Sequence, residues 1–179
     1  MFHPLAPLPR YARIACASVT LLLAPMAVQA QTWAGAFAGS NESPPNLSVA
    51  TGTAVVSLSG TSLSAFITFN NLIAPATAAH IHCCAAPGAN APVVVILINF
   101  PSATSGTLSN AFDLSNPAFL ATLLNGLNAG QAYVNIHNQT FPGGEIRANL
   151  TLVPEPSTYA LVAAGLAALG VAARRRRRA

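Results

Sequence analysis

Charged side chains are scarce in this 179-residue sequence, and lysine is absent. Five of the eight basic residues form a run at 174–178, and two more stand before residue 14. Between Gln31 and Val153 one arginine stands against three acidic residues, which leaves a net charge of −2, at Arg147, Glu42, Asp113 and Glu145. A phosphate-binding surface needs basic side chains spread over the folded part, so nucleic acid is excluded as a partner. So few carboxylates also give no paired-carboxylate hydrolase motif.

The first residues have the pattern of a secretion signal. Arg10 and Arg13 precede an apolar run at 14–27, and Val28-Gln29-Ala30 supplies the small residues that signal peptidase selects. We therefore expect a signal peptide at 1–30, cut after Ala30 by signal peptidase. The alternative is a retained membrane anchor, but the run is shorter than the roughly 20 residues that a spanning helix needs.

The last residues combine a proline-rich segment, an apolar stretch and arginines. The stretch at 159–173 would reach only about 22 Å as a helix. It would cross a ~30 Å hydrocarbon core only with thinning of the bilayer or snorkelling of the flanking arginines. Those arginines would stay cytoplasmic and leave the preceding domain outside.

This order resembles the PEP-CTERM sorting signal of Gram-negative bacteria, in which a Pro-Glu-Pro triplet, a transmembrane stretch and an arginine cluster follow one another. The matching positions within 153–179 are the triplet Pro154, Glu155 and Pro156, the stretch 159–173, and the membrane-stop residues Arg174, Arg175, Arg176, Arg177 and Arg178. The resemblance implies an exosortase as a processing partner. It also implies transient anchoring in the inner membrane by the C-terminal helix, then release to the cell surface or extracellular matrix.

The middle of the chain, 31–152, has the size of one domain. Extended runs are predicted at 53–58, 63–69, 78–82, 93–98, 131–137 and 145–152, with a turn at 59–62 that makes the first two a hairpin. The β-branched run at 93–98 favours a strand covered on both faces. Asn116-Pro117 begins a short helix that we expect to stop at Gly126. The pattern predicts an all-β fold, a single antiparallel β-sandwich or small barrel with one short helix.

Three segments of this domain, at 79–82, 132–137 and 141–147, resemble the CHRD domain in their order and spacing. The resemblance covers Thr32 to Leu152 and implies a fold and an exported location more than a reaction. One departure concerns the loop after His82, where Cys83-Cys84 stand in place of the family's frequent Gly-Pro.

The sharpest candidate site is formed by histidines. His80 and His82 alternate along one strand and so project from one face, and His137 would join them if its strand lay alongside. Three imidazoles suit Cu or Zn, in an arrangement loosely similar to copper/zinc superoxide dismutase. The alternatives are hydrogen bonds to loop backbone or a place on the solvent face.

With Cys16 removed in the signal peptide, Cys83 and Cys84 are the remaining thiols. A disulfide between them is the simplest expectation in an oxidising compartment, although adjacency strains the usual geometry. Two alternatives stay open for these cysteines: binding a metal as thiolates together with the nearby histidines, or forming disulfides with another molecule. Glu145 and Arg147 are expected to form a structural pair with each other or across the sheet.

The leading hypothesis is an exported, non-catalytic surface or matrix protein that binds polysaccharide or surface proteins, and no cofactor is expected. A structural filler of the matrix with no specific ligand is a further possibility. The competing hypothesis is a Cu/Zn-binding metalloprotein, with redox activity as an option, centred on His80, His82 and His137.

Overall fold

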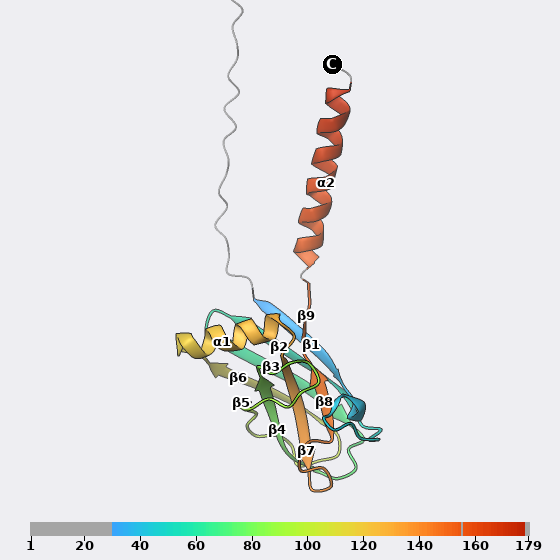
Figure 1. The fold of residues 1–179 in the computed structure, drawn as a ribbon, viewed down its shortest axis with the longest axis vertical. Helices are drawn as coiled ribbons and strands as arrows, with labels where there is room; N and C mark the ends of the chain where they lie inside the picture. Colours follow the sequence, from blue (N-terminus) through green and yellow to red (C-terminus); the bar gives the residue numbers. More distant parts are fainter. Residues whose placement is uncertain (1–29, 155, 178–179) are drawn as a thin grey trace, which may run out of the picture.

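The computed structural model describes residues 30–154 and 156–177, and its folded part is a sandwich of two antiparallel sheets (Figure 1). One sheet has the order β6-β3-β2-β1-β9 and is built from β6 (Gly106–Asp113), β3 (Ser62–Asn70), β2 (Thr51–Ser59), β1 (Gln31–Phe37) and β9 (Thr151–Leu152). The other has the order β5-β4-β7-β8 and is built from β5 (Val93–Ile96), β4 (Ala76–Cys83), β7 (Ala132–Asn138) and β8 (Ile146–Asn149). The predicted antiparallel β-sandwich is confirmed.

Alternation along the strands builds the core between the sheets. In β3, Leu63, Ala65, Ile67 and Phe69 are fully buried, and the residues between them face outward. The inner face of β7 contributes Val134 and Ile136 in the same way. Because successive strand side chains point to opposite faces, the opposite face of β7 is left for His137 and its neighbours.

The predicted hairpin forms with a tighter turn than expected. Ser59 pairs with Ser62, so only Gly60 and Thr61 connect β2 to β3. Gly60 has φ +60° at the first turn position, a conformation that glycine adopts without a steric cost.

The expectation that 93–98 forms a strand covered on both faces is wrong. The strand ends at Ile96, lies at the edge of its sheet and pairs only with β4. Val93, Ile96 and Ile98 are exposed. A short β-branched run can occur in a central strand or in an edge strand, so its composition alone does not determine whether one or both of its faces are buried.

Helix α1 (Pro117–Asn128) covers one end of the sandwich (Figure 1). Asn116 caps it, because its Oδ1 accepts hydrogen bonds from the backbone N–H groups of Ala118 and Phe119. The helix does not stop at Gly126 as expected but continues to Asn128, and Gly126 is buried.

Helix α2 (Pro156–Arg176) follows β9 and stands apart from the sandwich (Figure 1). It contains the apolar stretch 159–173 and continues into the arginine run. Among the residues that the structure describes, no helix combines the length and the apolarity needed to cross a membrane. The expected signal peptide, Glu155 and Arg178 fall outside the described residues, apart from Ala30.

Candidate functional site

The structure brings His80, His82 and His137 together on the outer face of the four-stranded sheet. Strands β4 and β7 are antiparallel neighbours, with His80 opposite Asn135 and Ala78 opposite His137. One nitrogen from each of the three rings lies within 4.8 Å of the others. His82 is buried, and the other two imidazoles are half-buried.

Two of these rings are fixed by backbone carbonyls. His82 Nδ1 donates to Ala91 O at 2.7 Å, and His137 Nδ1 donates to Pro142 O at 2.9 Å. Since a carbonyl oxygen only accepts, the hydrogen of each neutral ring is on Nδ1, which leaves Nε2 with a free lone pair. His82 Nε2 is buried, and no group in the part of the chain that the structure describes forms a hydrogen bond with it. His137 Nε2 lies 3.0 Å from His80 Nδ1.

The environment favours neutral imidazoles. Burial is the main cause that lowers the pKa of all three histidines, and for His80 the neighbouring rings of His137 and His82 lower the pKa further. The carbonyl of Ala91 and the side chain of Asn135 partly offset this effect on the pKa of His82, and the carbonyl of Pro142 does so for His137. Neutral imidazole is the form that ligates metal ions.

We expect the metal-free domain to lose stability as the pH falls below about 6.5. A histidine whose folded-state pKa lies below its unfolded value of 6.5 contributes stability above that value and loses it as the pH falls toward the folded-state pKa. Urea midpoints measured in EDTA between pH 7.5 and 5.0 test this, with the triple variant His80→Gln, His82→Gln, His137→Gln as reference. Burial raises the pKa of Glu42, so Glu42 makes the domain more stable as the pH falls, which is the opposite of the histidine effect. Glu42 is present in both the wild type and the triple variant, so its effect cancels in the comparison. Equal changes of the urea midpoint with pH in the two proteins would contradict the expectation.

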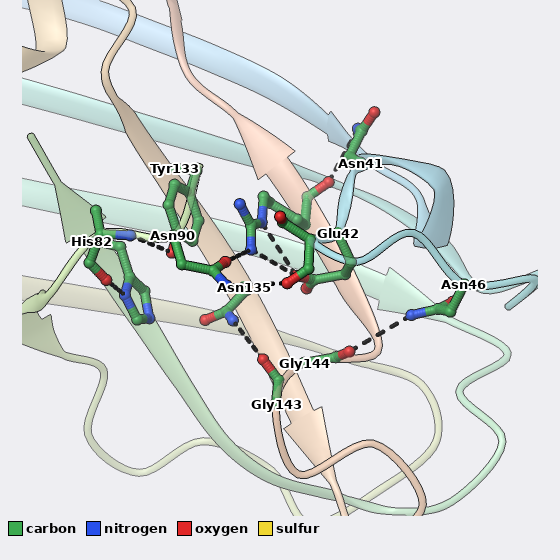
Figure 2. A network of polar contacts seen from close by, with 12 residues as sticks. Asn41, Glu42, Asn46, His82, Asn90, Tyr133, Asn135, Gly143 and Gly144 are labelled. Atoms are coloured by element: carbon green, nitrogen blue, oxygen red, sulfur yellow. Dashed lines mark hydrogen bonds and ion pairs between the residues drawn. The ribbon is translucent and has the colours of Figure 1, made fainter. Parts of the chain in front are cut away.

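A layer of buried polar and aromatic side chains continues from His82 (Figure 2). The Tyr133 ring stacks on His82 with centroids 4.7 Å apart and planes 6° apart, and the Arg147 guanidinium lies 3.9 Å from the Tyr133 centroid. Arg147 forms an ion pair of 2.9 Å with Glu42. These groups lie under the loops that precede β2 and β5.

The same side chains hold the loop that fixes His82. Arg147 Nη2 donates to Asn90 Oδ1 at 2.6 Å, and Arg147 Nη1 donates to Ala89 O at 3.3 Å. Tyr133 Oη accepts from the backbone N–H of Ala91 at 3.1 Å. The carbonyl of Ala91, which accepts from His82, is therefore positioned by Tyr133 and Arg147.

Of the two arrangements expected for Glu145 and Arg147, pairing with each other does not occur, and Arg147 pairs with another residue, Glu42 from the loop after β1. Glu145 Oε1 accepts from Ser48 Oγ at 2.5 Å and from the Ile73 backbone N–H at 3.0 Å, and Asn138 donates to its other oxygen. Glu145 thereby connects the loops of Ser48 and Ile73 with the end of β7, which is a structural role with partners other than Arg147.

Cys83 and Cys84 form a disulfide with each other. They do not join the histidine group, because the Cys83 side chain points to the face of β4 opposite His82. Both sulfurs lie instead against Gly126 of α1, and Cys84 Sγ is 3.6 Å from Thr122 O. The disulfide therefore belongs to the packing of α1.

Sequence reasoning missed Glu42, Tyr133 and Asn135. The alternation Tyr133-Asn135-His137 places all three on the face of the histidines, so the period of two could have identified two of the missed residues. Glu42 is separated from Arg147 by 105 positions, and no local pattern connects them.

A second feature is an open hollow of about 490 Å³ beside the loops at 46–49. Its walls include Leu47, Val49 and Ile73, whose exposed fractions are 99%, 81% and 66%. Amide and hydroxyl groups stand among them, from Asn46, Ser48 and Asn71. The hollow thus combines apolar contact area with neutral hydrogen-bonding groups.

The surface around this hollow carries almost no charge. Of the four charged residues within 30–154, Glu42, Glu145 and Arg147 are only 5%, 0% and 1% exposed. Asp113 is the one that is exposed. The few charges visible in the sequence are thus mostly withdrawn from the surface.

These features define an all-β sandwich with a polar cluster under the loops of one sheet and a helical C-terminal tail. The profile of the CHRD domain matches residues 35–150, and that of the PEP-CTERM protein-sorting motif matches residues 152–178. The chain therefore belongs to the CHRD domain family, and both resemblances read from the sequence are confirmed. No curated protein and no solved structure matches the chain.

The sorting motif implies export, transient membrane anchoring and processing by an exosortase. Neither family is known as an enzyme family. The protein is thus an exosortase-sorted extracellular protein.

Proposed function

We propose that the mature domain is a non-catalytic module of the cell surface or extracellular matrix that binds neutral polysaccharide. The observation that carries the proposal is the near-absence of charge on the folded surface of residues 30–154. Of the four charged residues in this range, Asp113 is the one that is exposed. Ion pairing with an acidic polymer needs exposed cations, and buried Arg147 supplies none. A partner without charge is therefore the one that this surface fits.

The hollow beside Leu47, Val49 and Ile73 supports this choice of partner. Small-molecule sites are mostly apolar with a few placed polar groups, and a sugar presents both C–H faces and hydroxyl groups to such a site. Asn71 supplies a side-chain amide that can donate and accept without introducing charge, whereas the Asn46 amide holds the loop beside the hollow through Ser48 N and Glu145 O.

Retention on insoluble neutral glucans tests the proposal. A chain that begins at Gln31 is expected to bind saturably to amylose or cellulose, with no loss of binding between 0.05 and 1 M NaCl, since screening weakens only charged contacts (~10 Å Debye length at 0.1 M). Replacing Leu47 and Ile73 together by serine should weaken binding about tenfold or more through lost apolar contact. The matched control is Phe66→Ser, which removes an exposed apolar side chain that does not line the hollow.

Three outcomes speak against this function. They are an absence of saturable binding to both neutral glucans, binding that disappears as salt is raised, and an equal effect of Phe66→Ser and the hollow variant.

A further inference from the structure

Beyond polysaccharide binding, we propose that His80, His82 and His137 bind one transition-metal ion, with Cu²⁺ held more tightly than Zn²⁺, and that Asn135 Oδ1 is the fourth protein ligand. The proposal concerns a different part of the domain from the hollow at Leu47 and Ile73. It rests on four properties of the cluster.

The first property is spacing. Nitrogens that share an ion at about 2.0–2.1 Å stand roughly 3.3–3.6 Å apart in tetrahedral or trigonal geometry. His80 Nδ1 and His137 Nε2 are already 3.0 Å apart, and the whole set lies within 4.8 Å. Small side-chain rotations would therefore bring the three rings onto one ion.

The second property is the support of the rings from behind. A metal-bound histidine nearly always donates its other ring N–H to a carboxylate, a carbonyl or water, which fixes the ring and the tautomer. His82 does so to Ala91 O, and His137 does so to Pro142 O. Both Nε2 atoms therefore carry no hydrogen and face the cluster, where Nε2 of His137 lies within hydrogen-bond distance of His80 Nδ1.

The third property is an unsatisfied atom. His82 Nε2 is buried and lacks a hydrogen-bond partner within residues 30–154 and 156–177. Buried polar atoms without partners are rare in folded proteins, and each one calls for an explanation. A metal ion bound between the rings would satisfy this lone pair.

The fourth property concerns Asn135, which is 2% exposed. Its Oδ1 lies 2.9 Å from His137 Nε2, yet His137 already carries its hydrogen on Nδ1, so two acceptors face one another. Flipping the Asn135 amide does not remove the mismatch. Its Nδ2 now donates to Gly143 O at 3.4 Å, and after the flip Oδ1 would face that carbonyl oxygen instead. An electrophile between the two atoms removes the conflict. A metal cation between the rings would act as that electrophile.

The donor set decides which ions fit. Three imidazole nitrogens and one amide oxygen suit Cu²⁺ and Zn²⁺, whereas Ca²⁺ and Mg²⁺ require mostly oxygen ligands. For one nitrogen-rich site, divalent affinity rises to a maximum at Cu²⁺ and falls at Zn²⁺. The disulfide keeps Cys83 and Cys84 out of the ligand set.

Titration of the mature chain, prepared without a histidine tag and stripped with EDTA, tests the site. Calorimetry with CuCl2 and ZnCl2 should give one ion per chain with the higher affinity for Cu²⁺, and the Cu²⁺ electron paramagnetic resonance spectrum should show nitrogen hyperfine coupling. His82→Gln should weaken Cu²⁺ binding at least 100-fold, and Asn135→Ala should weaken it about 10-fold. Gln131→Ala, beside the start of β7 and outside the cluster, is the matched control and should leave binding unchanged.

His80→Gln provides a second ligand variant at a half-buried position, in case His82→Gln fails to fold, and circular dichroism verifies the fold of each. The site is overturned if the wild-type chain binds neither ion stoichiometrically, or if folded histidine variants bind like the wild type. Binding that depends on the histidines but not on Asn135 overturns the fourth ligand. Glucan retention is measured separately, so failure of the metal site and failure of the polysaccharide function are distinguishable.

Discussion

Replacing Arg147 by methionine should lower the free energy of unfolding by about 3 kcal/mol at pH 7.5, because the substitution leaves the buried Glu42 carboxylate without its counter-charge. Methionine keeps an unbranched apolar stem against the Tyr133 ring, so lost packing contributes little. Urea denaturation of the metal-free domain measures the change. The deficit should shrink as the pH falls, because protonation of Glu42, whose pKa burial already raises, removes the uncompensated charge.

The double variant Glu42→Gln, Arg147→Met should recover much of this loss, because it removes both charges from the buried site. Asp113→Asn is the matched control, since it removes an exposed charge and should change stability by less than about 0.5 kcal/mol. If Arg147→Met and the double variant were equally unstable at all pH values, packing and not charge would explain the loss.

The parts of the fold that could be predicted from sequence are those that local chemistry determines. The hairpin around Gly60 follows from two alternating runs and a short turn, and the start of α1 follows from Asn116-Pro117. The pairing of His80 with His82 on one face needs only the period of a strand. His137 joins this pair only because β7 lies beside β4, and the sequence alone could not determine which strands are neighbours.

The predictions that were wrong or incomplete share a different cause, because they depend on contacts between residues that are distant in the sequence. Whether the run at 93–98 is central or at an edge depends on the sheet order, and here β4 is its only neighbour. Arg147 pairs with Glu42 in a loop 105 positions away, so the sequence could leave a distant partner open but could not name it. The burial of these few charges, which determines the character of the surface, follows from the loops that cover the outer face of the sheet.

At Gly126, replacing a helical glycine by alanine is expected to lower the stability of the domain instead of raising it. Glycine inside a helix costs about 0.8–1.0 kcal/mol relative to alanine, so Gly126→Ala should stabilise an isolated α1. In the folded domain, however, an added Cβ would collide with Cys83 Sγ and lie 2.6 Å from Cys84 Sγ. A disulfide cannot rotate out of the way as a flexible chain end can, so α1 or β4 must shift.

We therefore expect Gly126→Ala to destabilise the oxidised domain by about 2 kcal/mol, as overpacking exceeds the gain in helix propensity. In a Cys83→Ala, Cys84→Ala background the colliding sulfurs are gone, and the same substitution should become stabilising by up to about 1 kcal/mol. Urea unfolding of the four proteins of this cycle measures the coupling, and Gly143→Ala, whose Cβ would meet nothing within 4 Å, controls for a general effect of adding a methyl group. A stabilising effect of Gly126→Ala in both backgrounds would mean that the disulfide does not rest on the helix. A change of sign would show that Gly126 is required by the disulfide, and that the helix continues through this glycine because the sulfurs occupy the space of its missing side chain.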